Sequence, residues 1–163
     1  MSTQQQDFHH TSGSTAPAPT ITNAGTKPKV PHKLFVNIPV SDVQRSIIFF
    51  ETLGFTFNTQ FTDATSTAML VGEDAYFMLL TKEKFASFSK RPAGDPQKQT
   101  DALYALGVES RAAVEEMVNK AVANGGSHAL DPQDHGFMYG WSFYDPDGHH
   151  WEVFWMDPSV PVQ

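Results

Sequence analysis

Glu152, His150 and His135 are the residues whose types and spacing best suit chemistry. Glu152 lies between His150 and Phe154 at alternate positions of an aromatic stretch. If that stretch is a strand, the side chains of His150, Glu152 and Phe154 lie on the same face. A carboxylate at such a position indicates either a pocket residue or an exposed edge strand. In a pocket, Glu152 could act as a general base, with His150 or His135 as the acid.

Composition excludes several other kinds of function. The chain has no cysteine, so it has no thiol nucleophile, disulfide or thiolate metal site. It shows no recognisable Ser-His-Asp motif, phosphate-binding glycine loop or dinucleotide fingerprint. The formal net charge of -7 argues against nucleic acid or an anionic membrane as partner, and no apolar run could span a bilayer. These features leave thiol chemistry, nucleic-acid binding and membrane insertion outside the expected functions.

A turn precedes the strand of Glu152, and a second aromatic segment precedes the turn. Asp145-Pro146-Asp147-Gly148 has turn chemistry, because proline presets φ and glycine accepts a positive φ. Residues 131–141 are polar and then aromatic, and Gly140 suggests a bulge or the close approach of a ligand. Tyr139 and Trp141 are therefore candidate ligand-binding residues, with the face of their strand left open by one residue.

Composition also divides the chain near residue 31. Residues 1–31 are rich in Ser, Thr, Gln and Pro and lack the apolar run of a signal peptide, so we expect a disordered tail. Residues 32–158 have the apolar content of one ordinary domain. The absence of cysteine is compatible with a reducing compartment, and we expect a cytoplasmic protein.

The domain repeats one pattern twice. In residues 32–81, a strand at 33–40 precedes a helix that begins with a Ser41–Gln44 capping box and ends at Gly54. Three short strands follow, at 55–61, 65–71 and 75–80. In residues 101–158 the same order recurs. A strand at 102–108 precedes a helix capped by Ser110, and three strands are expected at 127–130, 137–143 and 149–155.

Neither half has much core alone, so the two must pack together. Arg45 and Arg111 lie near the two helix starts, where surface roles are expected. Residues 82–100 join the halves and carry five basic residues in an otherwise acidic protein. Phe85 and Phe88 predict a short helix there. This connector is either a solvated linker or a lid over a site.

The duplicated unit, with its Asp145-Pro146-Asp147-Gly148 turn and the glutamate in the strand that follows, resembles the vicinal oxygen chelate superfamily. That superfamily contains glyoxalase I, bleomycin-resistance proteins, fosfomycin-resistance enzymes and extradiol dioxygenases. The resemblance covers about residues 33–157. It implies an α+β fold in which two tandem βαβββ modules form a curved mixed sheet around a cleft. We also expect a homodimer, with the modules packed within one chain or swapped between two.

In metal-dependent members, the ligands come from the first and last strands of each module. The corresponding positions here are Phe35, Met78, Leu103 and Glu152, so three of the four are apolar. One carboxylate cannot hold a divalent ion against water. We therefore expect no cofactor. The alternative is a divalent metal bound by Glu152, with the two histidines named above as non-standard partners.

The resemblance also points one face of several strands into the cleft. The side chains expected to bind a ligand there are Phe35, Asn37, Tyr76, Met78, Leu103, Tyr139, Trp141 and Phe154. An aromatic cleft with few polar groups is typical of small-molecule sites. The chain is therefore expected to bind or modify a small organic molecule. The alternatives are a metal-dependent lyase (lactoylglutathione lyase-like), isomerase or dioxygenase, and a metal-free enzyme that uses Glu152 as base.

Overall fold

The structure, a computed structural model, describes residues 19–21, 25 and 27–160. Most of the tail expected at residues 1–31 lies outside the described residues, so its disorder stays a prediction. The chain divides into two units, Met1–Pro31 and His32–Gln163. All the helices and strands named below belong to the second unit.

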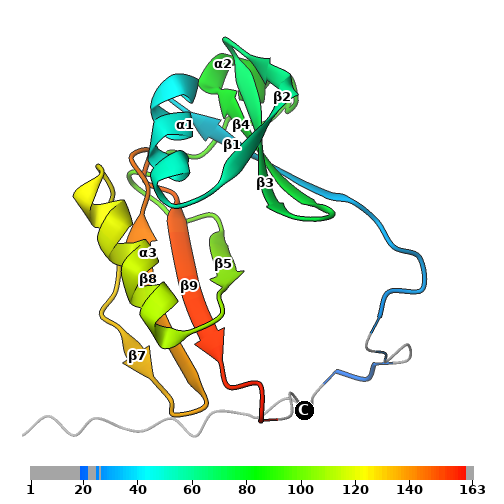
Figure 1. The fold of residues 1–163 in the computed structure, drawn as a ribbon. Coiled ribbons are helices and arrows are strands. Elements are labelled where there is room, and N and C mark those ends of the chain that lie inside the picture. The colour runs from blue at the N-terminus through cyan, green and yellow to red at the C-terminus, as the bar shows by residue number, and fades with distance from the viewer. Residues whose placement is uncertain (1–18, 22–24, 26, 161–163) are drawn as a thin grey trace, which may run out of the picture. The chain divides into compact units, whose positions relative to one another are not determined.

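The first half of this unit folds as one strand, one helix and three strands, in the predicted order (Figure 1). The elements are β1 (Leu34–Val40), α1 (Val43–Thr52), β2 (Thr56–Asp63), β3 (Ser66–Gly72) and β4 (Ala75–Thr81). The strands form one sheet of order β1-β4-β3-β2, in which β1 runs parallel to β4 and the other pairs are antiparallel. The connector contributes the short predicted helix, α2 (Lys82–Ser87).

The second half repeats this order with one addition. Its elements are β5 (Leu103–Gly107), α3 (Arg111–Ala123), β6 (Ser127–His128), β7 (Gln133–Asp134), β8 (Met138–Tyr144) and β9 (His150–Met156). The sheet order is β5-β9-β8-β6, with β5 parallel to β9, and the two-residue β7 also pairs with β8. The α+β fold of two βαβββ modules is therefore confirmed, with each module forming its own mixed sheet. No helix in the described part of the chain is long and apolar enough to cross a membrane.

Helix α1 begins one residue later than the capping box predicted. Asp42, not Ser41, is the N-cap, and its carboxylate accepts the backbone N–H of Arg45 at 3.0 Å. Both groups of Ser41 are used elsewhere. Its hydroxyl accepts a bond from the Arg45 guanidinium at 2.7 Å, and its backbone N–H donates to Asp147 at 2.8 Å. Ser41, the predicted cap residue, thus contacts Asp147 of the second half of the chain.

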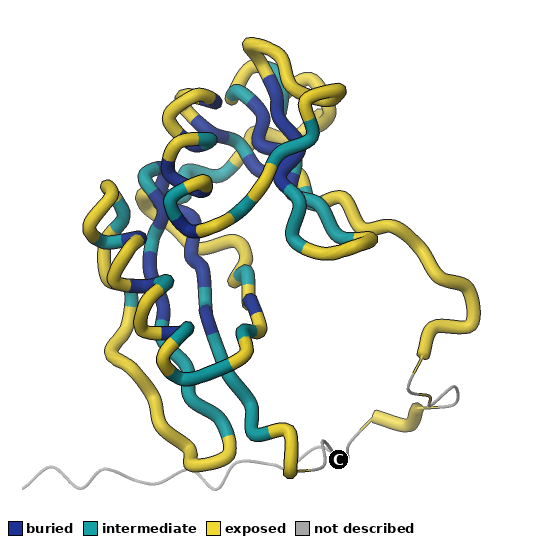
Figure 2. Tube along the Cα trace, in the orientation of Figure 1, coloured by how far each residue is buried: buried dark blue, intermediate teal, exposed yellow. Residues whose placement is uncertain are grey.

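Both halves contribute to one core on the helix side of the sheets. Trp151 of β9 is fully buried, and its ring lies 5.1 Å from that of Phe50 in α1 and 4.8 Å from that of Phe77 in β4. Burying a large apolar side chain contributes roughly 1.5–3 kcal/mol. Figure 2 shows the buried positions along β9 and on the inner sides of the helices. Because side chains alternate, this core leaves the opposite face of each sheet free.

The Asp145-Pro146-Asp147-Gly148 turn joins the two halves as well as strands β8 and β9. Asp147 is 7% exposed, accepts the Ser41 backbone N–H, and pairs with a guanidinium of α1 at 3.0 Å. The His149 ring lies with Nε2 2.7 Å from the Pro39 carbonyl oxygen. A carbonyl can only accept, so Nε2 carries the proton. The segment predicted only as a turn, together with His149 after it, therefore also bonds to the first module.

Asp145 is a buried carboxylate that organises the same turn. Its Oδ2 accepts the indole N–H of Trp151 at 3.0 Å, and its Oδ1 accepts the backbone N–H groups of Asp147 and His149 at 2.9 and 3.1 Å. Burial raises the pKa of Asp145, while His149 and these bonds act in the opposite direction. Gly148 closes the turn with φ +93, and a Cβ there would lie 2.8 Å from a carbonyl oxygen of the connector, so glycine is required.

Candidate functional site

The free face of the second sheet carries a hollow of about 390 Å³, which is within the usual size range of small-molecule sites. We call it the Glu152 hollow. Its floor comes from β5, β8 and β9, and its outer wall comes from the segment before β8. The side chains and backbone that line it include Ala105, Leu130, Asp131, Gln133, His135, Met138, Ser142, Glu152, Phe154 and Met156. Aromatic, thioether and aliphatic groups thus surround two carboxylates, and no Lys or Arg lines the hollow.

Glu152 lies on the floor of this hollow, as its alternation with Phe154 predicted. Its neighbours across the sheet are Ala105 on β5 and Ser142 on β8. It is half-buried, and among the described residues it has no hydrogen-bond or ion-pair partner. Leaving a polar group partly desolvated and unpaired costs free energy. A structural role therefore does not explain this carboxylate.

His135 lines the same hollow from the outer wall, and its backbone N–H donates to the Met138 carbonyl at 2.9 Å. Its side chain is exposed. The structure thus brings His135, Glu152 and Phe154 to one hollow. Of the two histidines considered as acids, His135 is the one that borders the same hollow as the carboxylate.

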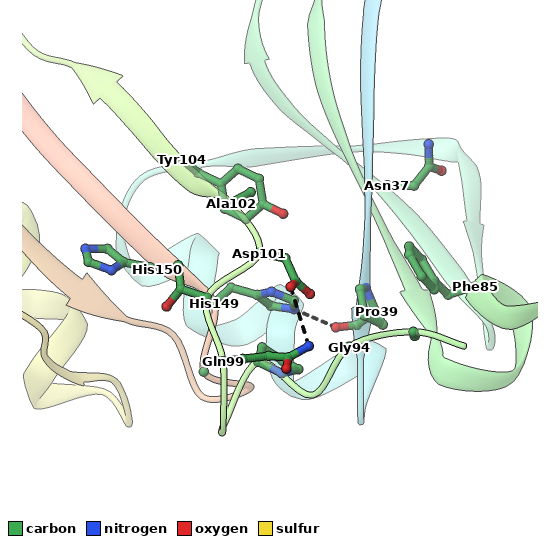
Figure 3. Close-up of a pocket in the computed structure, with 14 residues that line it drawn as sticks. Asn37, Pro39, Phe85, Gly94, Gln99, Asp101, Ala102, Tyr104, His149 and His150 are labelled. Atoms are coloured by element: carbon green, nitrogen blue, oxygen red, sulfur yellow. Dashed lines mark hydrogen bonds between the residues drawn. The ribbon is translucent and has the colours of Figure 1, made fainter. Parts of the chain in front are cut away.

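His150 shares the face of Glu152 but lies outside the hollow. It is 7% exposed, its ring contacts that of Tyr144 at 5.1 Å, and its Nε2 has no hydrogen-bond partner in the described structure. It borders a separate cavity of about 120 Å³, between β1, β5, the start of β9 and the connector. Figure 3 shows that His149 lies beside Pro39 in this cavity, whereas the ring of His150 points away from it.

The connector lines this small cavity and does not line the Glu152 hollow. Gly94, Gln99 and Thr100 of the connector line the small cavity, and the amide of Gln97 donates to the Pro146 carbonyl oxygen in the turn, 3.4 Å away. No residue from 82 to 100 lines the Glu152 hollow. The lid interpretation of the connector therefore stays a hypothesis, and it concerns the small cavity.

The first sheet brings together four other predicted residues on its own free face. Phe35 and Tyr76 stack with ring centroids 4.8 Å apart, and Phe35 is 50% exposed. Asn37 pairs with Met78 in register, and both line a second hollow of about 390 Å³. Lys84 also lines it, where its Nζ donates to hydroxyls of Ser66 at 2.8 Å and Thr65 at 3.0 Å. Asp63 also lines this first-sheet hollow and pairs with Lys84 at 3.5 Å, so its charges balance, whereas carboxylates without Lys or Arg line the Glu152 hollow.

The remaining predicted residues fall outside both hollows or only border them. Leu103 is 53% exposed on the free face of β5, opposite His150. The register of β8 with β9 pairs Trp141 with Val153, which turns Tyr139 and Trp141 toward α3. The Tyr139 hydroxyl donates to Glu115 of α3 at 3.1 Å. The Trp141 ring stacks on His128, although the residue borders the Glu152 hollow.

Several lining residues were missed from the sequence. The alternative face of β8 supplies Met138, Gly140 and Ser142, and only the pairing of Ser142 with Glu152 settles that choice. Gln133 lies in the two-residue strand β7, which is too short to give a periodic signal. The predicted ligand-binding residues of the two sheets do not form one site, because no residue from the first half lines the Glu152 hollow.

The residues present do not fit a divalent metal ion. Within the described residues, no group of three or more His, Asp or Glu side chains is placed to hold one. The nearest strand neighbours of Glu152 are an alanine and a serine, and the other expected positions are apolar. A divalent ion needs several oxygen or nitrogen ligands. The absence of a cofactor stays a prediction.

Elemental analysis of protein purified without chelator checks this prediction. We expect zinc, nickel, iron and manganese each well below one equivalent per chain. One equivalent in the wild type, lost in Glu152→Ala, would contradict it. Glu51→Ala, which changes an exposed carboxylate of α1, is the matched control.

Comparison with known proteins places the fold. The sequence family described as Glyoxalase/Bleomycin resistance protein/Dioxygenase superfamily matches residues 32–153. Comparison with curated proteins finds no match. A hypothetical protein from S. aureus is 25% identical, with a TM-score of 0.67, and the match covers 77% of this chain and 94% of that chain.

Two further structures share the fold at lower identity. A glyoxalase-related enzyme from Fulvimarina pelagi is 17% identical, with a TM-score of 0.67, covering 82% of this chain and 94% of that one. A glyoxalase/bleomycin resistance protein/dioxygenase family enzyme from Burkholderia phytofirmans PsJN is 19% identical, with a TM-score of 0.62, covering 75% and 96%. The domain of this chain belongs to the Glyoxalase/Bleomycin resistance protein/Dioxygenase superfamily.

Proposed function

We propose that this protein binds a small organic molecule in the Glu152 hollow, without a metal, and that the molecule has an apolar body and a cationic group. The observation that carries the proposal is Glu152 itself, a half-buried carboxylate with no partner among the described residues. A ligand cation would supply the missing partner. Phe154 and the two thioethers of the lining suit an apolar or aromatic body.

The surroundings of Glu152 favour a cation over an anion. Asp131 adds a second carboxylate to the lining, no Lys or Arg lines the hollow, and the whole chain carries a net charge of -7. An anionic ligand would meet like charge without a compensating donor. The apolar residues Phe35, Met78 and Leu103 argue for binding over a metal-dependent lyase, isomerase or dioxygenase.

A fluorescence titration with three aromatic probes tests this proposal. The probes are berberine, which is a planar cation, anthracene-9-methanol, which is neutral, and 8-anilinonaphthalene-1-sulfonate, which is an anion. We expect berberine to bind at least about tenfold more tightly than the anion, a difference of about 1.4 kcal/mol. Equal or tighter binding of the anion would contradict the proposed ligand class.

We further propose a cytoplasmic homodimer in which the first-sheet face of one copy covers the Glu152 hollow of the other. Both free faces carry exposed apolar side chains, among them Phe35 and Phe61 on the first sheet and Leu103 on the second. Exposed apolar patches of this kind mark interaction surfaces.

Light scattering after size exclusion checks the assembly. The wild-type chain has a mass of 18.0 kDa, and we expect a particle of twice that mass. Leu103→Glu should shift it to the monomer, since it places a charge on the apolar face beside Glu152. A monomeric wild type across micromolar concentrations would contradict the dimer and leave the ligand proposal standing.

A further inference from the structure

We infer that Arg111 is a positioning residue of this site. It fixes the arm, defined here as residues 129–137, that forms the outer wall of the Glu152 hollow. The contact between Arg111 and the arm also sets the affinity of the Glu152 hollow for its ligand, a claim that rests on the proposed function.

The position of the arm depends on its hydrogen bonds, because little of the arm is buried. Leu130, Asp131, Gln133 and His135 of the arm line the hollow, yet all residues from 131 to 137 are exposed (Figure 2). Hydrogen bonds to β8 run from the Ala129 and Leu130 N–H groups to Ser142, through the β7 pairing, and from the His135 N–H to the Met138 carbonyl oxygen. The Phe137 carbonyl oxygen accepts the Asp157 N–H at 2.8 Å, so Arg111 adds the side-chain contacts of the arm to helix α3. Segments with little buried area open locally at low free energy.

The Arg111 guanidinium donates three hydrogen bonds to the arm in a forked arrangement. Its Nη1 donates to Oδ2 of Asp134 at 2.6 Å, and its Nη2 donates to Oδ1 of Asp134 at 2.8 Å. Its Nη2 also donates to the Gly136 carbonyl oxygen at 2.8 Å. A bidentate guanidinium–carboxylate pair fixes direction as well as distance, which a lysine cannot do. The same Asp134 Oδ1 accepts the Gly136 N–H at 2.9 Å, so the fork also closes the bend of the arm.

The guanidinium also lies against two aromatic rings. Its carbon lies 5.1 Å from the ring centroid of Tyr139 and 5.2 Å from that of Trp155. Tyr139 is bonded in turn to Glu115 of α3. The hydrogen bonds from Arg111 lower the pKa of Asp134 to about 2, so the carboxylate stays charged throughout the neutral range. Helix α3, on one face of the sheet, is thereby tied to the wall of the hollow on the other.

The place of Arg111 in the helix supports this role. It is the first residue of α3, where the helix dipole disfavours a cation. The cap of the helix is supplied by Ser110, whose hydroxyl accepts the Ala113 N–H at 3.1 Å. Arg111 is therefore not the cap of this helix. Its hydrogen bonds run to Asp134 and Gly136 of the arm, and its guanidinium lies against the rings of Tyr139 and Trp155.

Hydrogen exchange and berberine titration of the full chain test the inference. The variants are Arg111→Gln, Arg111→Lys and Asp134→Asn, and the control is Lys120→Gln, which breaks an ion pair with Glu116 on the same helix. In Arg111→Gln we expect amides of residues 133–137 to exchange about tenfold faster, with β3 and β4 unchanged. Berberine should bind at least about fivefold more weakly. Arg111→Lys should resemble Arg111→Gln, since it keeps the charge and loses the fork.

The outcomes separate this inference from the proposed function. Unchanged exchange of the arm in both Arg111→Gln and Asp134→Asn would overturn the inference whatever berberine does. Faster exchange with unchanged berberine affinity would overturn the claim that the arm sets the site. If the wild type binds no berberine, the proposed ligand class fails, and faster exchange confined to the arm still supports Arg111 as its anchor.

Discussion

Glu152→Gln is expected to weaken berberine binding by about tenfold or more, because the quaternary cation then loses its Coulombic attraction to a partly desolvated carboxylate, on the order of 1.4 kcal/mol or more. The melting temperature should stay the same or rise. The carboxylate has no partner among the described residues, so its removal costs the fold no hydrogen bond. A stability gain paired with a binding loss is the expected signature of a functional residue.

The control for this variant is Glu51→Gln, which neutralises an exposed carboxylate on α1, far along the sequence from the hollow. Both substitutions change the net charge equally. If the two variants lose berberine affinity by the same factor, the effect comes from net charge and not from the site. Thermal unfolding of each variant, with and without probe, supplies both quantities.

Asp145→Ala is expected to have the largest effect on stability, lowering the free energy of unfolding by about 3–5 kcal/mol. The substitution leaves the buried indole N–H of Trp151 and two backbone N–H groups of the turn without their acceptor. It also loosens the turn whose next residues bond Ser41 and Pro39 of the first module. Chemical denaturation monitored by tryptophan fluorescence measures the loss.

Asp157→Ala is the matched control for this variant. Asp157 also accepts a local backbone N–H, from Ser159 at 2.9 Å, but it lies in an exposed turn after β9. We expect its replacement to cost less than about 1 kcal/mol. A similar small cost for Asp145→Ala would mean that the turn is not a structural link between the modules.

Local patterns predicted most of the elements because their causes are local. The N-cap at Ser110 and the stripe of apolar residues on α3 depend on residues within a few positions of each other. The alternation of Glu152 and Phe154 likewise fixes their shared face once the segment is a strand. The family fold followed from the repetition of these patterns.

Long-range contacts account for what the sequence could not give. Asp42 caps α1, and Ser41 instead donates its N–H to Asp147, a partner far along the chain that no local pattern indicates. The face of β8 was open by one residue until its register with β9 was known, and that register turned Tyr139 toward α3. Arg111 was expected to have a surface role, because no local sequence pattern indicates that Asp134 is its partner.

The division of the predicted site between two hollows has a similar cause. Strand periodicity placed Met78 and Glu152 on free faces but carried no information about whether those faces meet. In the structure, the shared core lies on the helix side, and each free face has its own hollow. The pairing of the two faces is a property of the proposed dimer.

The most direct test of the central claim is a map of amide chemical shifts during a berberine titration of ¹⁵N-labelled protein. We expect the largest changes at Glu152, Phe154, Gly140 and the arm, and we expect Glu152→Gln to need a berberine concentration about tenfold higher or more for the same changes. Changes confined to the small cavity around His149, or spread evenly over the surface, would contradict the assignment of the Glu152 hollow as the ligand site.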